Sequence, residues 1–252
     1  MDRLLRLLDS QHTEAGSAPP NHPYSPKNIV LSGYRANDAT DIQLLLTFAL
    51  AWTPIFATTW MAMAWYCPRL KLSDRLTVLW FVLCGTLHTF FEGYYLLNHE
   101  HMGQSMDVFA QLWKEYALSD SRYLTSSTFV LAAEGLTVVL LAPLSYSMVF
   151  LIATSSPYRT TVQIMVCFGH MYSDTLYYAT SGLDYYLHGV NHCRPEAYYF
   201  WVYYVAMNGV WMIVPAVLLL QAVRRNAQAF AALDRISKSM HTNGQLKMPN
   251  GL

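Results

Sequence analysis

Three pairs of polar side chains interrupt apolar stretches of the chain at spacings that a helix brings together. The pairs are His88 with Glu92, Glu134 with Thr137, and Asn208 with Trp211. Residues three or four apart share one face of a helix. An imidazole beside a carboxylate can give and take a proton, a second carboxylate can stabilise positive charge, and an indole face can hold a cation. Together these groups suit proton transfer through a carbocation in a site that excludes water.

Each pair also has a structural explanation. His88 and Glu92 could be a hydrogen-bonded pair that joins helices, and Glu134 could pair with His88 or with an arginine across a bundle. Trp211 lies deep within its apolar stretch, which fits poorly with the interfacial position usual for tryptophan in membranes. For the first two pairs the residues alone leave catalysis and packing both open.

A second polar group lies between residues 161 and 180. It contains His170, Asp174 and Tyr177. Structural hydrogen bonds explain most of this group, and Asp174 and Tyr177 are its candidates for substrate binding. The chain has no HExxH, GxSxG or glycine-rich phosphate loop, and its four cysteines form no CxxC pair. We therefore expect neither a metal nor another cofactor.

The composition predicts a membrane protein. The chain has 252 residues, of which 54% are hydrophobic and only 13% are charged, whereas soluble domains carry about 25% charged residues. Its 16 basic and 16 acidic residues cancel, so no strongly basic surface points to nucleic acid.

Five apolar segments are long enough to cross a bilayer core about 30 Å thick as helices. They are residues 42–66, 76–97, 128–153, 161–180 and 198–223. Backbone amides without partners are too costly in lipid, which requires helices. We predict an all-α membrane protein with five transmembrane helices: a polar N-terminal arm (1–40), a membrane domain (41–226) and a polar C-terminal tail (227–252). A large soluble helical bundle is the alternative, but its helices rarely run this long without a charged face.

Several sequence blocks are specific to one known family. They are His22-Pro23-Tyr24-Ser25-Pro26, Gln111-Leu112-Trp113-Lys114-Glu115-Tyr116-Ala117, Asp120-Ser121-Arg122-Tyr123 and Tyr199-Phe200-Trp201, together with the three polar pairs. Through these blocks, from residue 22 to residue 223, the chain resembles the emopamil-binding protein family, the sterol Δ8–Δ7 isomerases.

The resemblance implies a five-helix fold of the endoplasmic reticulum membrane that encloses a sterol pocket open to lipid. The family's functional positions match all six residues of the polar pairs, and Tyr116 would line the pocket. His88, coupled to Glu92, would handle the proton delivered to the C8=C9 bond. Glu134 and Trp211 would stabilise the cation at C8, and loss of a C7 proton would give the Δ7 product. Amines that mimic this cation are ligands of the family.

Two positions depart from the family pattern and leave the substrate open. Gly135 stands where a larger polar residue is expected, and Ser173 replaces a glycine. The main hypothesis is a sterol isomerase. The alternatives are an isomerase or proton-initiated cyclase acting on another polycyclic or prenylated lipid, and a lipid-binding protein without catalysis. Small residues such as Gly169 and Ser173 would permit a homodimer.

Overall fold

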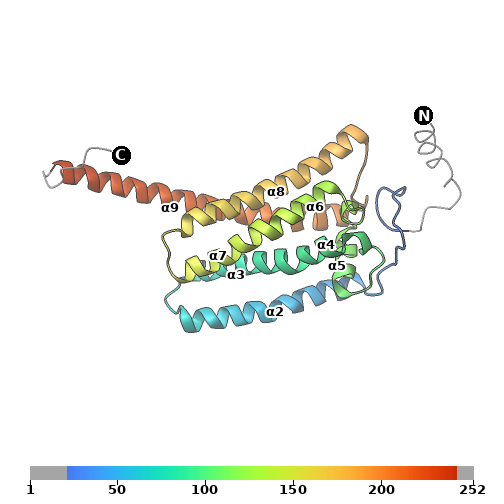
Figure 1. The fold of residues 1–252 in the computed structure, drawn as a ribbon, viewed down its shortest axis with the longest axis horizontal. Helices are drawn as coiled ribbons and strands as arrows, with labels where there is room; N and C mark the ends of the chain where they lie inside the picture. Colours follow the sequence, from blue (N-terminus) through green and yellow to red (C-terminus); the bar gives the residue numbers. More distant parts are fainter. Residues whose placement is uncertain (1–21, 243–252) are drawn as a thin grey trace, which may run out of the picture. The chain divides into compact units, whose positions relative to one another are not determined.

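The computed structural model describes residues 22–242, and every regular element in this range is a helix. The α-helices are α2 (Asp41–Tyr66), α3 (Leu72–Thr86), α4 (Gly93–Asn98), α5 (Val108–Tyr116), α6 (Thr128–Leu136), α7 (Ala142–Ala153), α8 (Arg159–His188) and α9 (Asn208–Thr242) (Figure 1). Three π-helical segments are η1 (Leu87–Glu92), η4 (Thr137–Leu141) and η5 (Tyr199–Met207), and two 3₁₀ turns are η2 (His99–His101) and η3 (Ser121–Tyr123). The predicted all-α class is confirmed.

Four helical stretches within the described range are long and apolar enough to cross a membrane, one fewer than the five predicted. They are Asp41–Tyr66, Leu72–His101, Thr128–Ala153 and Tyr199–His241. The remaining predicted span, 161–180, lies in α8, which has 30 residues but a more polar sequence. Gln163 and His170 of this helix are 2% and 3% exposed. Their polar groups therefore serve contacts inside the protein, which explains why α8 is less apolar than a helix facing lipid.

Apolar side chains are exposed along α2. Leu46, Leu50 and Trp65 are examples, and only 11% of the most apolar part of this helix is buried. Soluble monomers rarely expose contiguous apolar surface of this kind, whereas lipid chains would solvate it. We therefore treat the four apolar stretches as membrane-spanning.

The chain divides into two compact units. Among the described residues, the first unit contains 22–49, Tyr94–Ala132 and Thr180–Ala206, and the second contains Leu50–Gly93, Ala133–Ala179 and 207–242. Within the second unit α3 packs against α7, and η1 packs against η4. Its buried core is formed by Met63, Val78, Phe81, Leu141, Met148, Ile152, Val166, Cys167 and Leu218.

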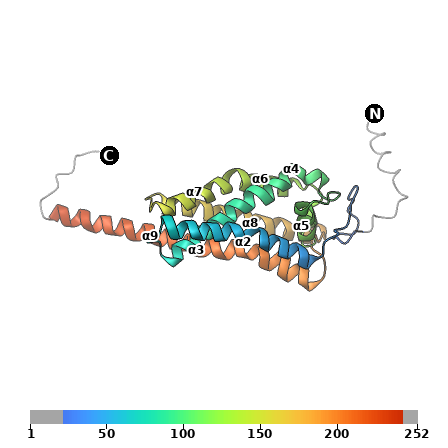
Figure 2. The same ribbon diagram turned by 90° about the horizontal axis from the view of Figure 1, so that it is seen from below.

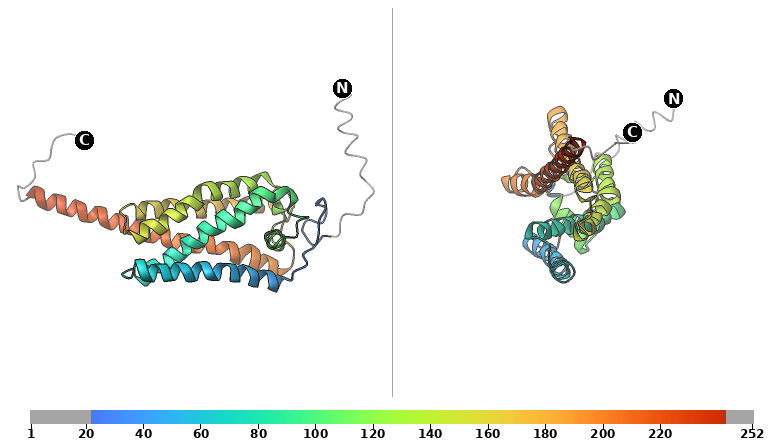
Figure 3. Two further views of the ribbon diagram at one scale, coloured as in Figure 1. Left: turned by 60° about the horizontal axis from the view of Figure 1, so that its bottom comes forward. Right: turned by 90° about the vertical axis from the view of Figure 1, so that its left-hand side faces the viewer.

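Helix α9 continues without interruption to Thr242 (Figures 2 and 3). Residues 227–242 of the predicted tail are therefore helical. An exposed ion pair of 2.7 Å joins Asp234 and Lys238 one turn apart on this helix. Residues 1–21 and 243–252, which include part of the predicted arm and the end of the predicted tail, lie outside the described residues.

Helices α3 and α7 approach closely at Gly85. A Cβ atom at this position would lie 2.9 Å from a ring carbon of Tyr146. Because the tyrosine ring must rotate or the two helices must separate to make room, we expect Gly85→Ala to destabilise the protein by about 1–3 kcal/mol. The midpoint of thermal unfolding in detergent would measure this. Gly135→Ala is the control, since a Cβ atom added there would meet no atom within 4 Å, and equal midpoints for the two variants would contradict the prediction.

In the first unit, Lys114 of α5 is buried and ties three segments together. Its ammonium group donates to the carbonyl oxygens of Arg35 at 2.9 Å and Ser105 at 2.8 Å. Its own carbonyl accepts from the Tyr24 hydroxyl at 3.1 Å. Burial lowers the pKa of Lys114, and the two carbonyls supply the hydrogen bonds that a buried ammonium requires.

A buried ion pair follows α5 in the same unit. The Asp120 carboxylate contacts the Arg122 guanidinium at 2.6 Å, and the two side chains are 0% and 4% exposed. Asp120 also accepts from the Arg122 backbone amide at 3.0 Å, and the guanidinium donates to the Thr180 hydroxyl at 2.9 Å. Asp120 and Arg122 belong to the blocks that carry the family resemblance, and this contact gives them a structural role.

Candidate active site

The first polar pair lies in a π-helical segment of the second unit. In η1, His88 and Glu92 are 3% and 7% exposed, and the His88 Nδ1 atom lies 2.7 Å from both carboxylate oxygens of Glu92. The predicted pairing on one helix face is therefore confirmed. π-Helical turns are rare and are found often at functional sites.

Thr137 connects this pair to a second π-helical segment. It is the first residue of η4, and its hydroxyl donates to Glu92 Oε2. It also lies 2.8 Å from the backbone carbonyl of Glu134. The Glu92 carboxylate therefore contacts the Thr137 hydroxyl and the His88 ring nitrogen, and an ionised carboxylate can only accept at both contacts. We accordingly assign a proton to Nδ1 of His88.

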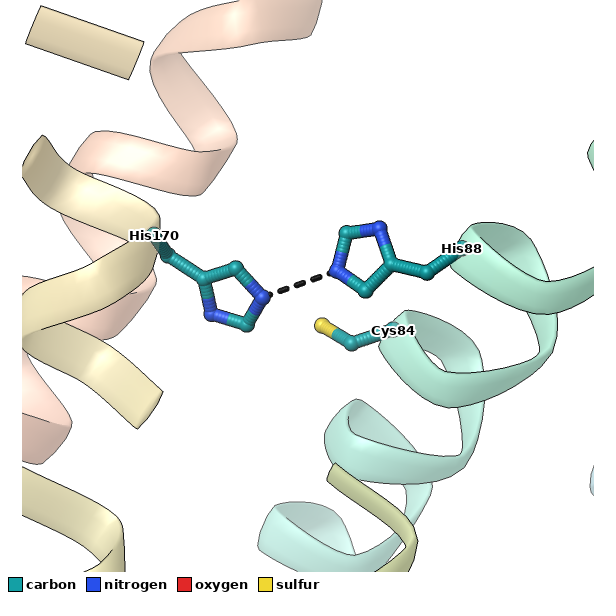
Figure 4. A group of neighbouring side chains, drawn as sticks. All are labelled: Cys84, His88 and His170. Carbon is teal, nitrogen blue, oxygen red and sulfur yellow. Dashed lines mark hydrogen bonds between the residues drawn. The ribbon is translucent and has the colours of Figure 1, made fainter. Parts of the chain in front are cut away.

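The second ring nitrogen of His88 meets α8. His88 Nε2 lies 2.9 Å from His170 Nε2, and the ring centroids are 5.1 Å apart. Figure 4 shows the two imidazoles facing each other from different helices, with the Cys84 thiol beside them. The sequence pattern put His170 in a group with mostly structural roles and did not predict this contact. A signal was present, because the buried residues Gln163, His170 and Tyr177 of α8 recur every seven positions.

The remaining pair lies at the start of α9. Asn208 is the first residue of this helix, directly after η5. The Trp211 ring packs against Trp80, with centroids 5.5 Å apart and an angle of 49° between the planes, and its side chain lies near that of Cys84. The Cys84 thiol adjoins the imidazole pair within the second unit.

The chain is similar to known proteins over most of its length. The family description EBP: EXPERA (EXPanded EBP superfamily) matches residues 108–222. The 3-beta-hydroxysteroid-Delta(8),Delta(7)-isomerase of Cavia porcellus is 33% identical over 231 residues, which cover 91% of this chain and 98% of the relative. The chain belongs to the emopamil-binding protein family. The isomerase of the same name from Rattus norvegicus is 32% identical over 216 residues, covering 85% and 93% of the two chains. Protoglabretal synthase of Ailanthus altissima is 28% identical over 216 residues, covering 85% and 96%.

The other predicted site residues differ in their burial and in the unit to which they belong. Glu134 is half-buried one turn before Thr137. Asp174 is half-buried one turn after His170, with its Oδ2 atom buried and without a hydrogen-bond partner among the described residues. Tyr177 is buried on the next turn. Tyr116 belongs to the first unit, where its ring packs against Tyr123 with centroids 5.3 Å apart.

Cys84, His88 and His170 also form a set of potential metal ligands. Their donor atoms all lie within 4.8 Å of one another, and thiolate with imidazole is a donor set that zinc accepts. However, the two Nε2 atoms are 2.9 Å apart and joined by a hydrogen bond. Two imidazole nitrogens on a tetrahedral zinc would be about 3.3 Å apart, given zinc–nitrogen bonds of about 2.0 Å. The distance favours a hydrogen-bonded pair of rings.

Proposed function

We propose that this protein is a membrane isomerase that moves a ring double bond of a sterol from Δ8 to Δ7. The observation that carries the proposal is the buried contact of His88 with Glu92, completed by Thr137. It couples an imidazole to a carboxylate inside an apolar stretch of the chain. Relatives named 3-beta-hydroxysteroid-Delta(8),Delta(7)-isomerase, which match nearly the whole chain, support the same function.

In the proposed reaction, the pair of His88 and Glu92 holds the proton that the substrate receives, and Glu92 stabilises the charged form of His88. The electron pair of the C8=C9 bond takes the proton at C9, which leaves a carbocation at C8. Loss of a proton from C7 then returns an electron pair and forms the C7=C8 bond. The product is an isomer of the substrate, so no co-reactant is consumed. Exclusion of water prevents capture of the cation.

The other polar positions would stabilise and orient the substrate. We assign the Trp211 ring, backed by Trp80, to the cation, because an indole face attracts positive charge. Glu134 would add a negative charge and Asn208 a hydrogen bond. Substrate-binding roles are proposed for Tyr116, Asp174 and Tyr177.

A related reaction on another polycyclic lipid is the second candidate. Relatives named protoglabretal synthase and isomeliandiol synthase match the chain at 28% and 33% identity, so this family includes proteins with other names and products. The same proton-transferring and cation-stabilising groups would catalyse that reaction. Turnover of an 8-ene sterol, compared with turnover of a triterpenoid or a linear prenyl substrate, separates the candidates.

We propose that the protein resides in the endoplasmic reticulum membrane. Fractionation of cells that express it tests this location, and we expect the protein in the endoplasmic reticulum fraction. A homodimer stays a prediction. Gly169, one of the small residues that would permit it, has a role within the single chain, since a Cβ there would lie 2.7 Å from a methyl carbon of Leu141.

The decisive experiment is isomerisation in deuterated water. Microsomes that contain the protein are incubated with an 8-ene sterol, and the product is analysed by mass spectrometry and NMR. The proposal expects a Δ7 sterol that carries deuterium at C9. Microsomes that contain the folded protein and form no such product would contradict the sterol assignment and favour the second candidate.

Replacing Thr137 with valine should reduce turnover. The change keeps the shape of the side chain but removes the hydroxyl that donates to Glu92. A hydrogen bond to a charged group contributes about 1.5–3 kcal/mol, so we expect kcat to fall about 10- to 100-fold. Thr77→Val is the control, because the only partner of the buried Thr77 hydroxyl among residues 22–242 is the Ser73 carbonyl, at 2.8 Å. Equal kcat values for the two variants would show that Glu92 does not need this donor.

A further inference from the structure

Neither ring nitrogen of His88 is available to a substrate in this structure. Nδ1 is held by Glu92 at 2.7 Å and Nε2 by His170 at 2.9 Å. A group that transfers protons must have an atom at which protons arrive or leave. The next such atom along this chain of contacts belongs to His170.

The hydrogen bonds assign the protons of the two rings when both are neutral. Glu92 keeps the His88 proton on Nδ1, so His88 Nε2 offers a lone pair. The contact of 2.9 Å then requires His170 to donate from its own Nε2. His170 Nδ1 is left with a lone pair, and this buried atom has no hydrogen-bond partner among the described residues. Buried polar atoms without a partner are uncommon, and each calls for an explanation.

We infer that His170 is a proton carrier for His88, and that its Nδ1 is the atom at which the proton enters and leaves. The inference rests on the proposed isomerase function. When a proton binds to Nδ1 of His170, the proton on its Nε2 passes to Nε2 of His88. His88 becomes an imidazolium beside the Glu92 carboxylate, and His170 is again neutral. The reverse sequence releases the proton. The proton comes from the substrate or from solvent water and returns to one of them, so no other reactant is needed.

A purely structural hydrogen bond between helices is the competing explanation. Glutamine at position 170 separates the two, because its amide can donate to His88 Nε2 but cannot carry a proton. A structural role predicts that His170→Gln keeps its activity. Proton transfer predicts that His170→Gln and His170→Ala both lose activity, and that only the alanine variant, which has space for a small base, recovers with added imidazole.

Steady-state turnover of an 8-ene sterol by the full chain in nanodiscs provides the first test. For both variants we expect kcat to fall about 10²-fold, within the range of general acid–base effects, while KM stays unchanged. Gln163→Leu is the matched control. Gln163 is equally buried on α8 and donates to the Leu218 carbonyl at 2.8 Å, so its loss should lower thermal stability and leave kcat intact. Full kcat in His170→Gln would overturn the inference.

Nitrogen-15 NMR of histidine-labelled protein gives a second test that needs no turnover. We expect His170 to carry its proton on Nε2 and His88 on Nδ1, and the His88 resonances to shift in His170→Gln. A His170 protonated on Nδ1 alone, or His88 resonances that ignore the substitution, would overturn the inference. A wild-type protein without sterol turnover but with the expected spectra would refute the proposed substrate and leave the proton-carrier pair supported.

Discussion

Replacing His88 with alanine should lower the turnover of an 8-ene sterol by about 10²- to 10⁴-fold, the range of a positioned general acid or base. We expect a large effect on turnover because His88 lies between Glu92 and His170 and contacts both of them. Its removal separates the carboxylate from the second imidazole, because each of them contacts a nitrogen of the His88 ring. The measurement is product formed per minute, together with the deuterium content at C9 in deuterated water.

Loss of activity must be separated from loss of folding. Binding of an amine that mimics the carbocation, measured on the same preparation, would show that the variant is folded. His99→Ala is the matched histidine control. His99 is half-buried in the first unit and hydrogen-bonds the Ser126 hydroxyl at 2.8 Å, and we expect its loss to leave kcat unchanged. A His88→Ala protein with normal turnover would exclude a role of His88 in proton transfer.

The second large effect concerns stability. Asp120→Asn should destabilise the protein by about 3–5 kcal/mol, since it leaves the buried Arg122 guanidinium without a counter-charge. Asparagine has nearly the same shape and still offers an oxygen to the Arg122 backbone amide, so the change removes little except charge. For a chain of this size each kcal/mol lowers the midpoint of thermal unfolding by about 2–4 °C. The expected shift is therefore about 6–20 °C.

The ion pair of α9 provides the control. Asp234→Asn removes a carboxylate that contacts Lys238 at 2.7 Å, but these side chains are 60% and 75% exposed. An exposed pair contributes about 0–1 kcal/mol, so its midpoint should stay close to that of the wild type. Similar midpoints for the two variants would mean that water reaches Arg122, and that burial of the Asp120 pair does not matter for stability.

Several features of this protein could be predicted from local sequence alone. Apolar length predicted the four membrane-spanning stretches, because the thickness of a bilayer sets the length of a helix that crosses it. The spacing of His88 and Glu92 predicted their contact, because the two residues lie on one helix and need no distant partner. The blocks from Gln111 to Tyr123 predicted the family, which the similarity to curated relatives confirms.

The span count shows where local reasoning failed. The predicted span 161–180 was inferred from average apolarity, which cannot tell a polar side chain facing lipid from one facing protein. Gln163 and His170 are buried against other helices of the second unit. Their polarity reflects partners that lie far away in the sequence.

The composition of the candidate site also depends on tertiary structure, because its members are far apart in the sequence. His88 and His170 are separated by 82 positions, and Glu92 and Thr137 by 45, so only the packing of helices brings them together. The π-helical turns at η1 and η4 change the direction of the side chains in a way that residue spacing does not reveal. Sequence by itself determined the apolar helices, the family and the local pair of His88 with Glu92. Tertiary structure decided that Thr137 and His170 complete this pair, because a hydrogen bond depends on distance and direction in space rather than on position along the chain.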